Sequence, residues 1–219
     1  MAQDDASVQL YRALLSHDSA EAIRVVERAK RRGVEQARLF DQVFAPALSM
    51  LGGAWADGSI DDYSFARASV AAEQITSFVI PPSASSDTGI TVLLGTMQGD
   101  LHTIGKAIAG AALRDAGHRV VDLGASVRPA EFLQRAEETG ACVLIVYAQL
   151  EATARSVLRV RETFTAAGRG DVAILVSGGP FAADPSLARA VGANGVVRGA
   201  ESALRLVVRA ARHVEGGAA

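Results

Sequence analysis

The stretch ITVLLGTMQGDLHTIGKAIAG, residues 90–110, decides the fold, because it joins an apolar run to a helical pattern through a glycine-containing turn. Five such apolar runs recur at a spacing of about 25 residues, which suits crossover helices and is too long for hairpins. They are apolar on both faces, as buried parallel strands require. We therefore predict a flavodoxin-like (Rossmann-like) α/β domain with a five-stranded parallel sheet over residues 90–219. The runs lie at residues 90–96, 119–124, 142–148, 172–179 and 195–199.

Before this domain the apolar residues repeat with a helical period, which predicts a four-helix bundle over residues 1–80. Asp18 begins a capping-box pattern at the start of the second helix, and Gly33 is placed to end it. Pro46 predicts a kink in the third helix, and the fourth is expected over 61–78.

The segment between the two patterns, residues 81–89, reads PPSASSDTG and has the composition of a linker. We place the domain boundary there.

Charge and composition exclude several classes of protein. With 22 basic and 24 acidic side chains the net charge is −2, which disfavours direct binding to nucleic acid or to an anionic membrane. No uninterrupted apolar run approaches the ~20 residues that span a bilayer, and no signal-peptide pattern opens the chain. Cys142, the one cysteine, lies in an apolar run and is expected to be a buried structural thiol. A cytoplasmic location is expected.

The place of a ligand site follows from the topology of the sheet, because ligands of open parallel sheets bind where the strand order reverses, between the first and third strands. The loop after the first strand lacks the glycine spacing of a phosphate-binding loop, and the chain has no G-x-S-x-G hydrolase elbow. The loop carries Asp100 and His102 instead.

An Asp-x-His pair in an extended turn points both side chains the same way. The carboxylate of Asp100 can then fix the imidazole of His102, leaving one nitrogen as an oriented base. This arrangement suits a metal ligand or a general base, and a helix cap is the plainer alternative. The other histidines do not complete a zinc site, so a single imidazole would suffice only if a macrocycle filled the remaining metal positions.

At these residues the chain resembles a known family. The sequence GDLHTIGKAIAGAALRDAGHRVVDLG, residues 99–124, is similar to the Asp-x-His-x-x-Gly signature of cobalamin (vitamin B12)-binding domains, as in corrinoid methyl carriers and methionine synthase. The resemblance covers nearly the whole chain, since APALSMLGGAWADGSI, residues 45–60, looks like the helical cap that precedes this domain.

The resemblance implies cobalamin, as methylcobalamin or adenosylcobalamin, bound with its own base displaced from cobalt. His102 would be the lower cobalt ligand, with Asp100 behind it, and Gly105 would let the first helix approach the nucleotide tail. Gly178 and Gly179 would line the end of the tail, unless they form an ordinary strand-to-helix turn. The cofactor-binding residues implied are Trp55, Asp100, His102, Thr103, Ile104, Gly105, Tyr147, Gln149, Leu150, Gly178 and Gly179.

The third strand departs from the family pattern. Where Ser-x-Leu is usual, the chain has Tyr147, Ala148, Gln149 and Leu150, and Tyr147 replaces the serine that bonds the lower base in the family. The tail pocket is therefore rearranged or the lower base differs, and Gln149 could supply a substitute hydrogen bond.

Trp55, the one tryptophan, lies where the resembling proteins cover the upper face of cobalamin. A tryptophan of the bundle core is the alternative. Tyr63 and Phe65 are expected in that core.

The resemblance implies a corrinoid methyl carrier that shuttles a methyl group between methyltransferase partners by base-off, His-on cobalamin. The alternative is a cobalamin-dependent light or ligand sensor acting through a partner regulator, which Trp55 favours. Against the sensor, its usual Glu-His pair is Phe65 and Ala66 here, and no DNA-binding domain is expected before the bundle. A cobalamin chaperone or storage protein is a third interpretation, and a homo-oligomer is possible.

Overall fold

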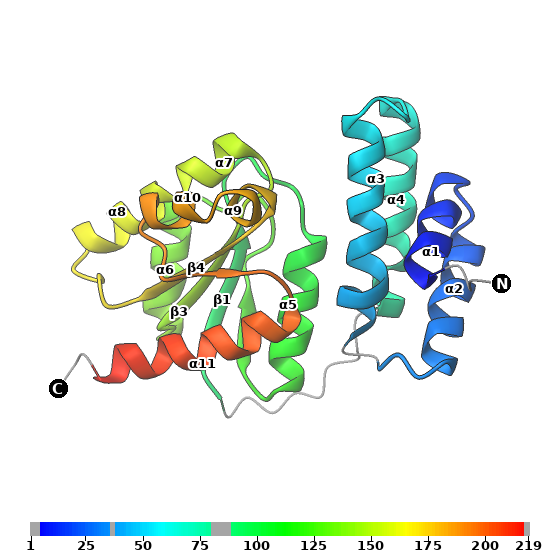
Figure 1. Cartoon of the computed structure of the whole chain (residues 1–219). Coiled ribbons are helices and arrows are strands. Elements are labelled where there is room, and N and C mark those ends of the chain that lie inside the picture. Colours follow the sequence, from blue (N-terminus) through cyan, green and yellow to red (C-terminus); the bar gives the residue numbers. More distant parts are fainter. Residues whose placement is uncertain (1–4, 36–37, 80–88, 217–219) are drawn as a thin grey trace. The chain divides into compact units, whose positions relative to one another are not determined.

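The computed structural model describes residues 5–35, 38–79 and 89–216, coloured along the chain in Figure 1. They form two compact units that divide near residue 82, a helical unit and an α/β unit, and each is described by itself. Of the predicted linker, residues 81–88 lie outside the described residues.

The helical unit is held by an apolar interior that faces inward from each helix, with Leu14, Val26, Leu51 and Ile75 almost fully buried. Asp18 accepts the backbone N–H of Glu21 at 2.8 Å and so caps the second helix, as its pattern predicts. The helices are α1(Ala6–Leu15), α2(Ser19–Arg31), α3(Ala45–Ala56) and α4(Asp62–Val79), with a π-helical turn η2(Phe40–Phe44) before α3.

The third helix differs from the prediction of a kink at Pro46. The chain is wound as a π-helix over η2, and Pro46 lies in the first turn of α3, directly after it. The physical reason is that proline has no N–H to donate to the preceding turn, where a wider winding relieves the interrupted ladder. The irregularity therefore lies just before Pro46.

The α/β unit contains the predicted five-stranded parallel sheet, in the order β2-β1-β3-β4-β5. The chain passes from β1 to one side to form β2 and then returns to the other side of β1 to form β3, so the order reverses between β1 and β3. The strands are β1(Thr91–Thr96), β2(Arg119–Asp122), β3(Val143–Tyr147), β4(Ala173–Ser177) and β5(Gly195–Val197).

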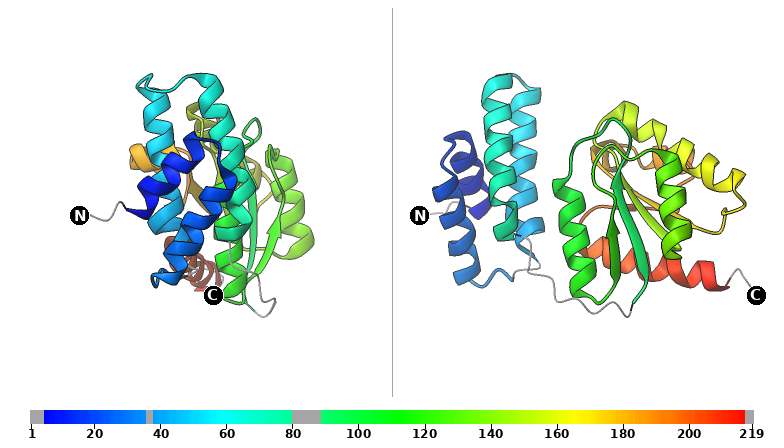
Figure 2. Two further views of the ribbon diagram at one scale, coloured as in Figure 1. Left: turned by 90° about the vertical axis from the view of Figure 1, so that its right-hand side faces the viewer. Right: turned by 180° about the vertical axis from the view of Figure 1, so that it is seen from behind.

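Helices cover both faces of the sheet, which gives three layers (Figures 1 and 2). Because side chains alternate along a strand, Leu144 and Val146 pack into one apolar cluster while Ile145 and Tyr147 pack into the other. Cys142 is half-buried beside the second cluster, whereas a buried thiol was expected. The helices are α5(Ile104–Asp115), α6(Pro129–Thr139), α7(Glu151–Ser156), α8(Leu158–Ala166), α9(Gly179–Ala183), α10(Pro185–Ala190) and α11(Ala200–Gly216).

Within the described ranges, no helix combines the length and the apolar character needed to cross a membrane.

Candidate functional site

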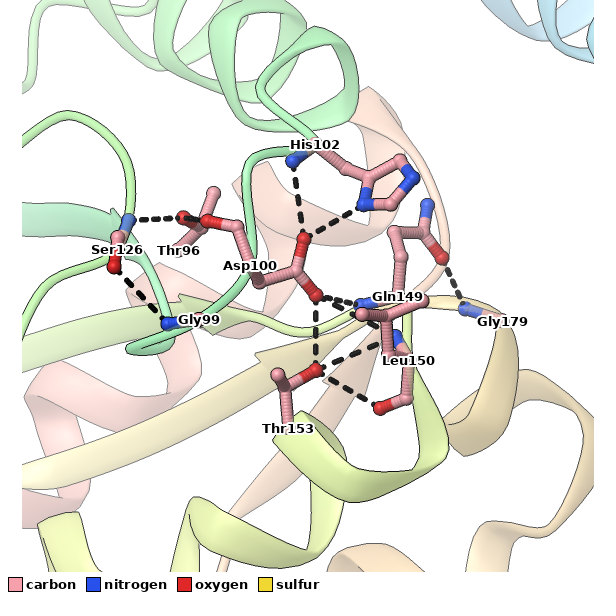
Figure 3. Close-up of polar contacts among 9 residues, drawn as sticks. All are labelled: Thr96, Gly99, Asp100, His102, Ser126, Gln149, Leu150, Thr153 and Gly179. Carbon is pink, nitrogen blue, oxygen red and sulfur yellow. Dashed lines mark hydrogen bonds and ion pairs between the residues drawn. The ribbon is translucent and has the colours of Figure 1, made fainter.

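The loop after β1 is shaped by a turn at Gly99, whose φ of +85° favours glycine. The N–H of Gly99 donates to the hydroxyl of Ser126 at 3.0 Å. The backbone oxygen of Asp100 accepts the hydroxyl of Thr96 at 2.5 Å, and Ser126 donates its own N–H to the same oxygen at 3.0 Å. These bonds fix Asp100 at the carboxyl edge of the sheet, where β1 and β3 lie side by side (Figure 3).

Asp100 is 1% exposed, and hydrogen bonds reach both oxygens of its carboxylate. Oδ1 accepts the backbone N–H of His102 at 3.0 Å and contacts ring nitrogen Nδ1 of the same residue at 2.7 Å. Oδ2 accepts the N–H of Gln149 at 2.6 Å and the hydroxyl of Thr153 at 2.9 Å. The carboxylate therefore ties the loop after β1 to the loop after β3.

The charge of Asp100 is set by two opposing effects. Burial disfavours the ionised form, but the hydrogen bonds from His102, Gln149 and Thr153 outweigh it and hold the pKa of Asp100 below its ordinary value. Asp100 is therefore a carboxylate at neutral pH and an acceptor for every group around it.

The ring of His102 is 58% exposed, although its Nδ1 contacts a fully buried group. Because ionised Asp100 can only accept, Nδ1 carries the proton and Nε2 keeps its lone pair. The ring bonds Asp100 rather than the amides that open α5, so the helix-cap interpretation of His102 is wrong. The site thus presents one oriented, basic nitrogen.

The two loops of the site carry exposed leucines. Leu101, between Asp100 and His102, is 75% exposed, and Leu150, the last residue before α7, is about half exposed. Thr103 and Ile104 follow at the N-terminus of α5 and are partly buried. Exposed leucines in the same two loops as the imidazole favour an apolar ligand over water.

Tyr147 ends β3 and points to the face of the sheet that α5 and α11 cover. It is 4% exposed, and its hydroxyl is buried with no hydrogen-bond partner in the described part of the chain. A methyl group added to Gly105 would lie 3.7 Å from the tyrosine ring, so Gly105 and Tyr147 face each other across the interior. An unsatisfied buried donor at the switch point fits a ligand that enters there with an acceptor.

Gln149 and the two glycines after β4 form a second contact between strand ends. The side-chain oxygen of Gln149 accepts the N–H of Gly179 at 2.6 Å. A Cβ on Gly178 would lie 1.8 Å from the carbonyl oxygen of Ala148, and its φ of +138° also requires glycine. The close packing of β3 against β4 accounts for Gly178.

Trp55 lies near the end of α3 and is 46% exposed, so the bundle-core interpretation of this residue is wrong. Its indole stacks on Phe65 with ring centroids 4.7 Å apart, and its N–H donates to Asp62 at 2.8 Å. Tyr63, expected in the core, is exposed on α4, and Phe65 is half-buried. Trp55 is an exposed aromatic side chain held in one orientation.

Several residues of the site escaped prediction from the sequence. Thr153, in the first turn of α7, and Ser126, in the loop after β2, both bond to Asp100, and polar residues in the first turn after a strand end were the signal available for Thr153. Lys106, almost fully buried on α5, contacts both oxygens of Asp122 at the end of β2 at 2.5 Å. This ion pair fastens α5, and with it the His102 loop, to the sheet.

A doubly wound sheet that presents one oriented imidazole at its switch point, with exposed leucines in the adjoining loops, is the arrangement expected of a protein that binds a metal macrocycle. The comparisons with known proteins agree: the model of the B12 binding domain family matches residues 90–208. This chain belongs to that family, and its cofactor is cobalamin.

The relatives of the chain include corrinoid proteins. It is 30% identical over 181 residues to trimethylamine corrinoid protein 1 of Methanosarcina acetivorans, covering 78% of this chain and 82% of the relative. The monomethylamine corrinoid protein of Methanosarcina barkeri has a similar fold, with a TM-score of 0.78 and 17% identity over 91% of this chain and 95% of that one. A structure of the methanol:cobalamin methyltransferase complex of M. barkeri matches with a TM-score of 0.50 and 19% identity over 95% and 81%.

Proposed function

We propose that this chain is a corrinoid methyl carrier that holds cobalamin through His102 and passes a methyl group between methyltransferase partners. The contact of Asp100 with Nδ1 of His102 carries the proposal, because it fixes the ring and leaves Nε2 as the nitrogen available to a ligand on a largely exposed side chain. Bound cobalamin supplies the cobalt centre that accepts and releases the methyl group. The relatives named for trimethylamine and the methyltransferase complex support a methyltransferase as partner.

The role of Asp100 in this proposal is to orient His102. Its carboxylate accepts the hydrogen bond from Nδ1 at 2.7 Å, so the ring would present Nε2 to the metal. The other oxygen of the buried carboxylate is held by the loop after β3, which would keep the ring in place as a ligand.

Trp55 is proposed to cover the upper face of the cofactor. Two observations support this proposal: the indole is exposed, and it is held in place by stacking on Phe65. Trp55 therefore offers a rigid, flat apolar surface. Thr103, Ile104, Gln149 and Leu150 are proposed contacts around the lower face.

The proposal is tested by electron paramagnetic resonance of the protein loaded with cobalamin and reduced to Co(II). Hyperfine splitting from one axial nitrogen should change from three lines to two when the protein is labelled with ¹⁵N-histidine. The variant His102→Ala should lose the label-dependent splitting. A hyperfine splitting that is the same with and without the ¹⁵N label, or a wild-type protein that binds no corrinoid, contradicts the proposal.

Trp55 also favours a second candidate, a cobalamin-dependent light or ligand sensor that acts through a partner regulator. Illumination of the loaded protein separates the two. A light-driven change of oligomeric state supports the sensor, whereas methyl transfer to a partner methyltransferase without such a change supports the carrier. A cytoplasmic location and a homo-oligomer remain predictions.

A further inference from the structure

Ser126, in the loop after β2, has a backbone conformation that its side chain disfavours. Its φ is +55°, and Ser126 and His17 are the two residues other than glycine with a positive φ in the described part of the chain. In this region a Cβ lies too close to the following carbonyl oxygen, whereas glycine enters it freely. Strain that is kept at one loop position indicates that the position has a task.

The backbone and the side chain of Ser126 both bond to the loop that carries His102. The N–H of Ser126 points to two oxygens, the hydroxyl of Thr96 at 2.8 Å and the carbonyl of Asp100 at 3.0 Å. Its hydroxyl accepts the N–H of Gly99 at 3.0 Å. Figure 3 shows these contacts on the side of Asp100 opposite to the loop after β3. Ser126 therefore holds two consecutive residues of the loop.

The segment around Ser126 is itself anchored to the edge of the sheet. Thr96 donates its N–H to the carbonyl of Gly124 at 3.1 Å and accepts the N–H of Val127 at 2.9 Å. A parallel bridge joins Met97 to Val127. These contacts continue the pairing of β1 with β2 beyond the ends of the two strands. The strained conformation of Ser126 persists because bonds on both sides of it fix the chain.

We propose that Ser126 is a positioning residue for His102, which orders the loop after β1 before the cofactor binds. This inference rests on the proposed function. Asp100 fixes the ring of His102 and is held from the side of β3, whereas Ser126 fixes the peptide groups of the same loop from the side of β2. A loop that is ordered from both sides needs little further ordering when its imidazole binds a metal.

Two variants separate the hydroxyl of Ser126 from its backbone strain. Ser126→Ala removes the acceptor of the Gly99 N–H and keeps a Cβ at positive φ, so the melting temperature of the free protein should fall by about 2–5 °C. Ser126→Gly removes the same acceptor but relieves the strain, so its melting temperature should stay closer to that of the wild type. Both variants should bind cobalamin about three- to tenfold more weakly in an absorption titration. If the role were merely structural, the affinity would follow the melting temperature instead.

Amide hydrogen exchange of the free, ¹⁵N-labelled protein reports on the loop without the cofactor. The N–H of His102, which donates to Asp100 at 3.0 Å, should exchange about three- to tenfold faster in both variants, because the loop opens more often. Ser202→Ala is the matched control, since the hydroxyl of Ser202 also accepts a backbone N–H, that of Gly199, at 3.0 Å. It should change neither the exchange of His102 nor the affinity for cobalamin.

The outcomes separate this inference from the proposed function. Weaker binding and faster exchange of His102 in both Ser126 variants, with Ser202→Ala unaffected, support the inference. Normal affinity or normal exchange in Ser126→Gly overturns the role of Ser126 while the function stands. A wild-type protein that binds no cobalamin overturns the function itself.

Discussion

Asp100 holds His102 at two points, because the same carboxylate oxygen accepts the backbone N–H at 3.0 Å and contacts Nδ1 of the ring at 2.7 Å. Both the peptide and the side chain of the histidine are thereby fixed to one buried atom. Although His102 lies in a loop, its position is therefore as fixed as that of the sheet. A metal ligand held in this way loses little conformational entropy when it binds its metal.

Asp100→Asn should lower cobalamin affinity by about 10- to 100-fold, the usual effect of losing the partner of a metal-binding histidine. The amide has almost the same shape but is a poorer acceptor for Nδ1, so the ring loses its orientation. Absorption titration measures the affinity. Asp61→Asn, which changes a cap on the helical unit, is the matched control and should bind normally. Equal affinity in Asp100→Asn and wild type would remove Asp100 from the site.

The same carboxylate should make the α/β unit sensitive to acid. The folded pKa of Asp100 lies below its ordinary value of about 3.9, so the folded state binds fewer protons than the unfolded one between these values. Its contribution is complete above pH ~4 and is lost as the pH falls through the lowered pKa. The difference in unfolding free energy between wild type and Asp100→Asn should therefore shrink below that pH. A difference that is constant down to pH 2 would contradict this.

Lys106 and Asp122 should respond unequally to substitution. Lys106 is almost fully buried, whereas the side chain of Asp122 is 32% exposed and also accepts the N–H of Gly124 at 2.8 Å. Asp122→Ala leaves the buried ammonium of Lys106 without its carboxylate partner and should lower the unfolding free energy by about 3–5 kcal/mol. Lys106→Met leaves a carboxylate that water can reach and should cost roughly 1–2 kcal/mol. Denaturant unfolding measures both, and the reverse order would show that Asp122 is the more dependent partner.

The sequence pattern sufficed for the parts of this molecule that periodicity controls. Apolar runs such as residues 142–148 predict buried strands, and the spacing of Asp100 and His102 predicts that their side chains are in contact. The sequence pattern could not predict the hydrogen bond between Thr153 and Asp100, which are far apart in the chain. They meet only because β1 and β3 pair in one particular register. The stack of Trp55 on Phe65 likewise depends on how α3 and α4 pack, which a single sequence does not encode locally.

Trp55→Ala should open the upper face of bound cobalamin without changing its lower ligand. Without the indole that stacks on Phe65, the upper face of the cofactor would be open to small ligands. Cyanide should therefore bind the loaded protein several-fold faster, as followed by absorption. The ¹⁵N-histidine splitting should persist. Tyr63→Ala, which removes an exposed aromatic ring from α4, serves as the control and should leave the rate unchanged. The same acceleration in both variants, or in neither, would count against a cap at Trp55.

Gly178 and Gly179 should differ sharply although they are neighbours. At Gly178 a Cβ would overlap the carbonyl oxygen of Ala148 at 1.8 Å, and φ +138° with ψ 163° is a conformation that other residues hardly adopt. Gly178→Ala should therefore cost about 3 kcal/mol or more, because backbone must move. At Gly179 the nearest atom to a Cβ is the flexible Gln149 side chain at 3.4 Å, so Gly179→Ala should cost roughly 1 kcal/mol or less. Thermal unfolding of the two variants without cofactor measures this difference. Equal losses would mean that Gly178 is retained for the ligand and not for the packing of β3 against β4.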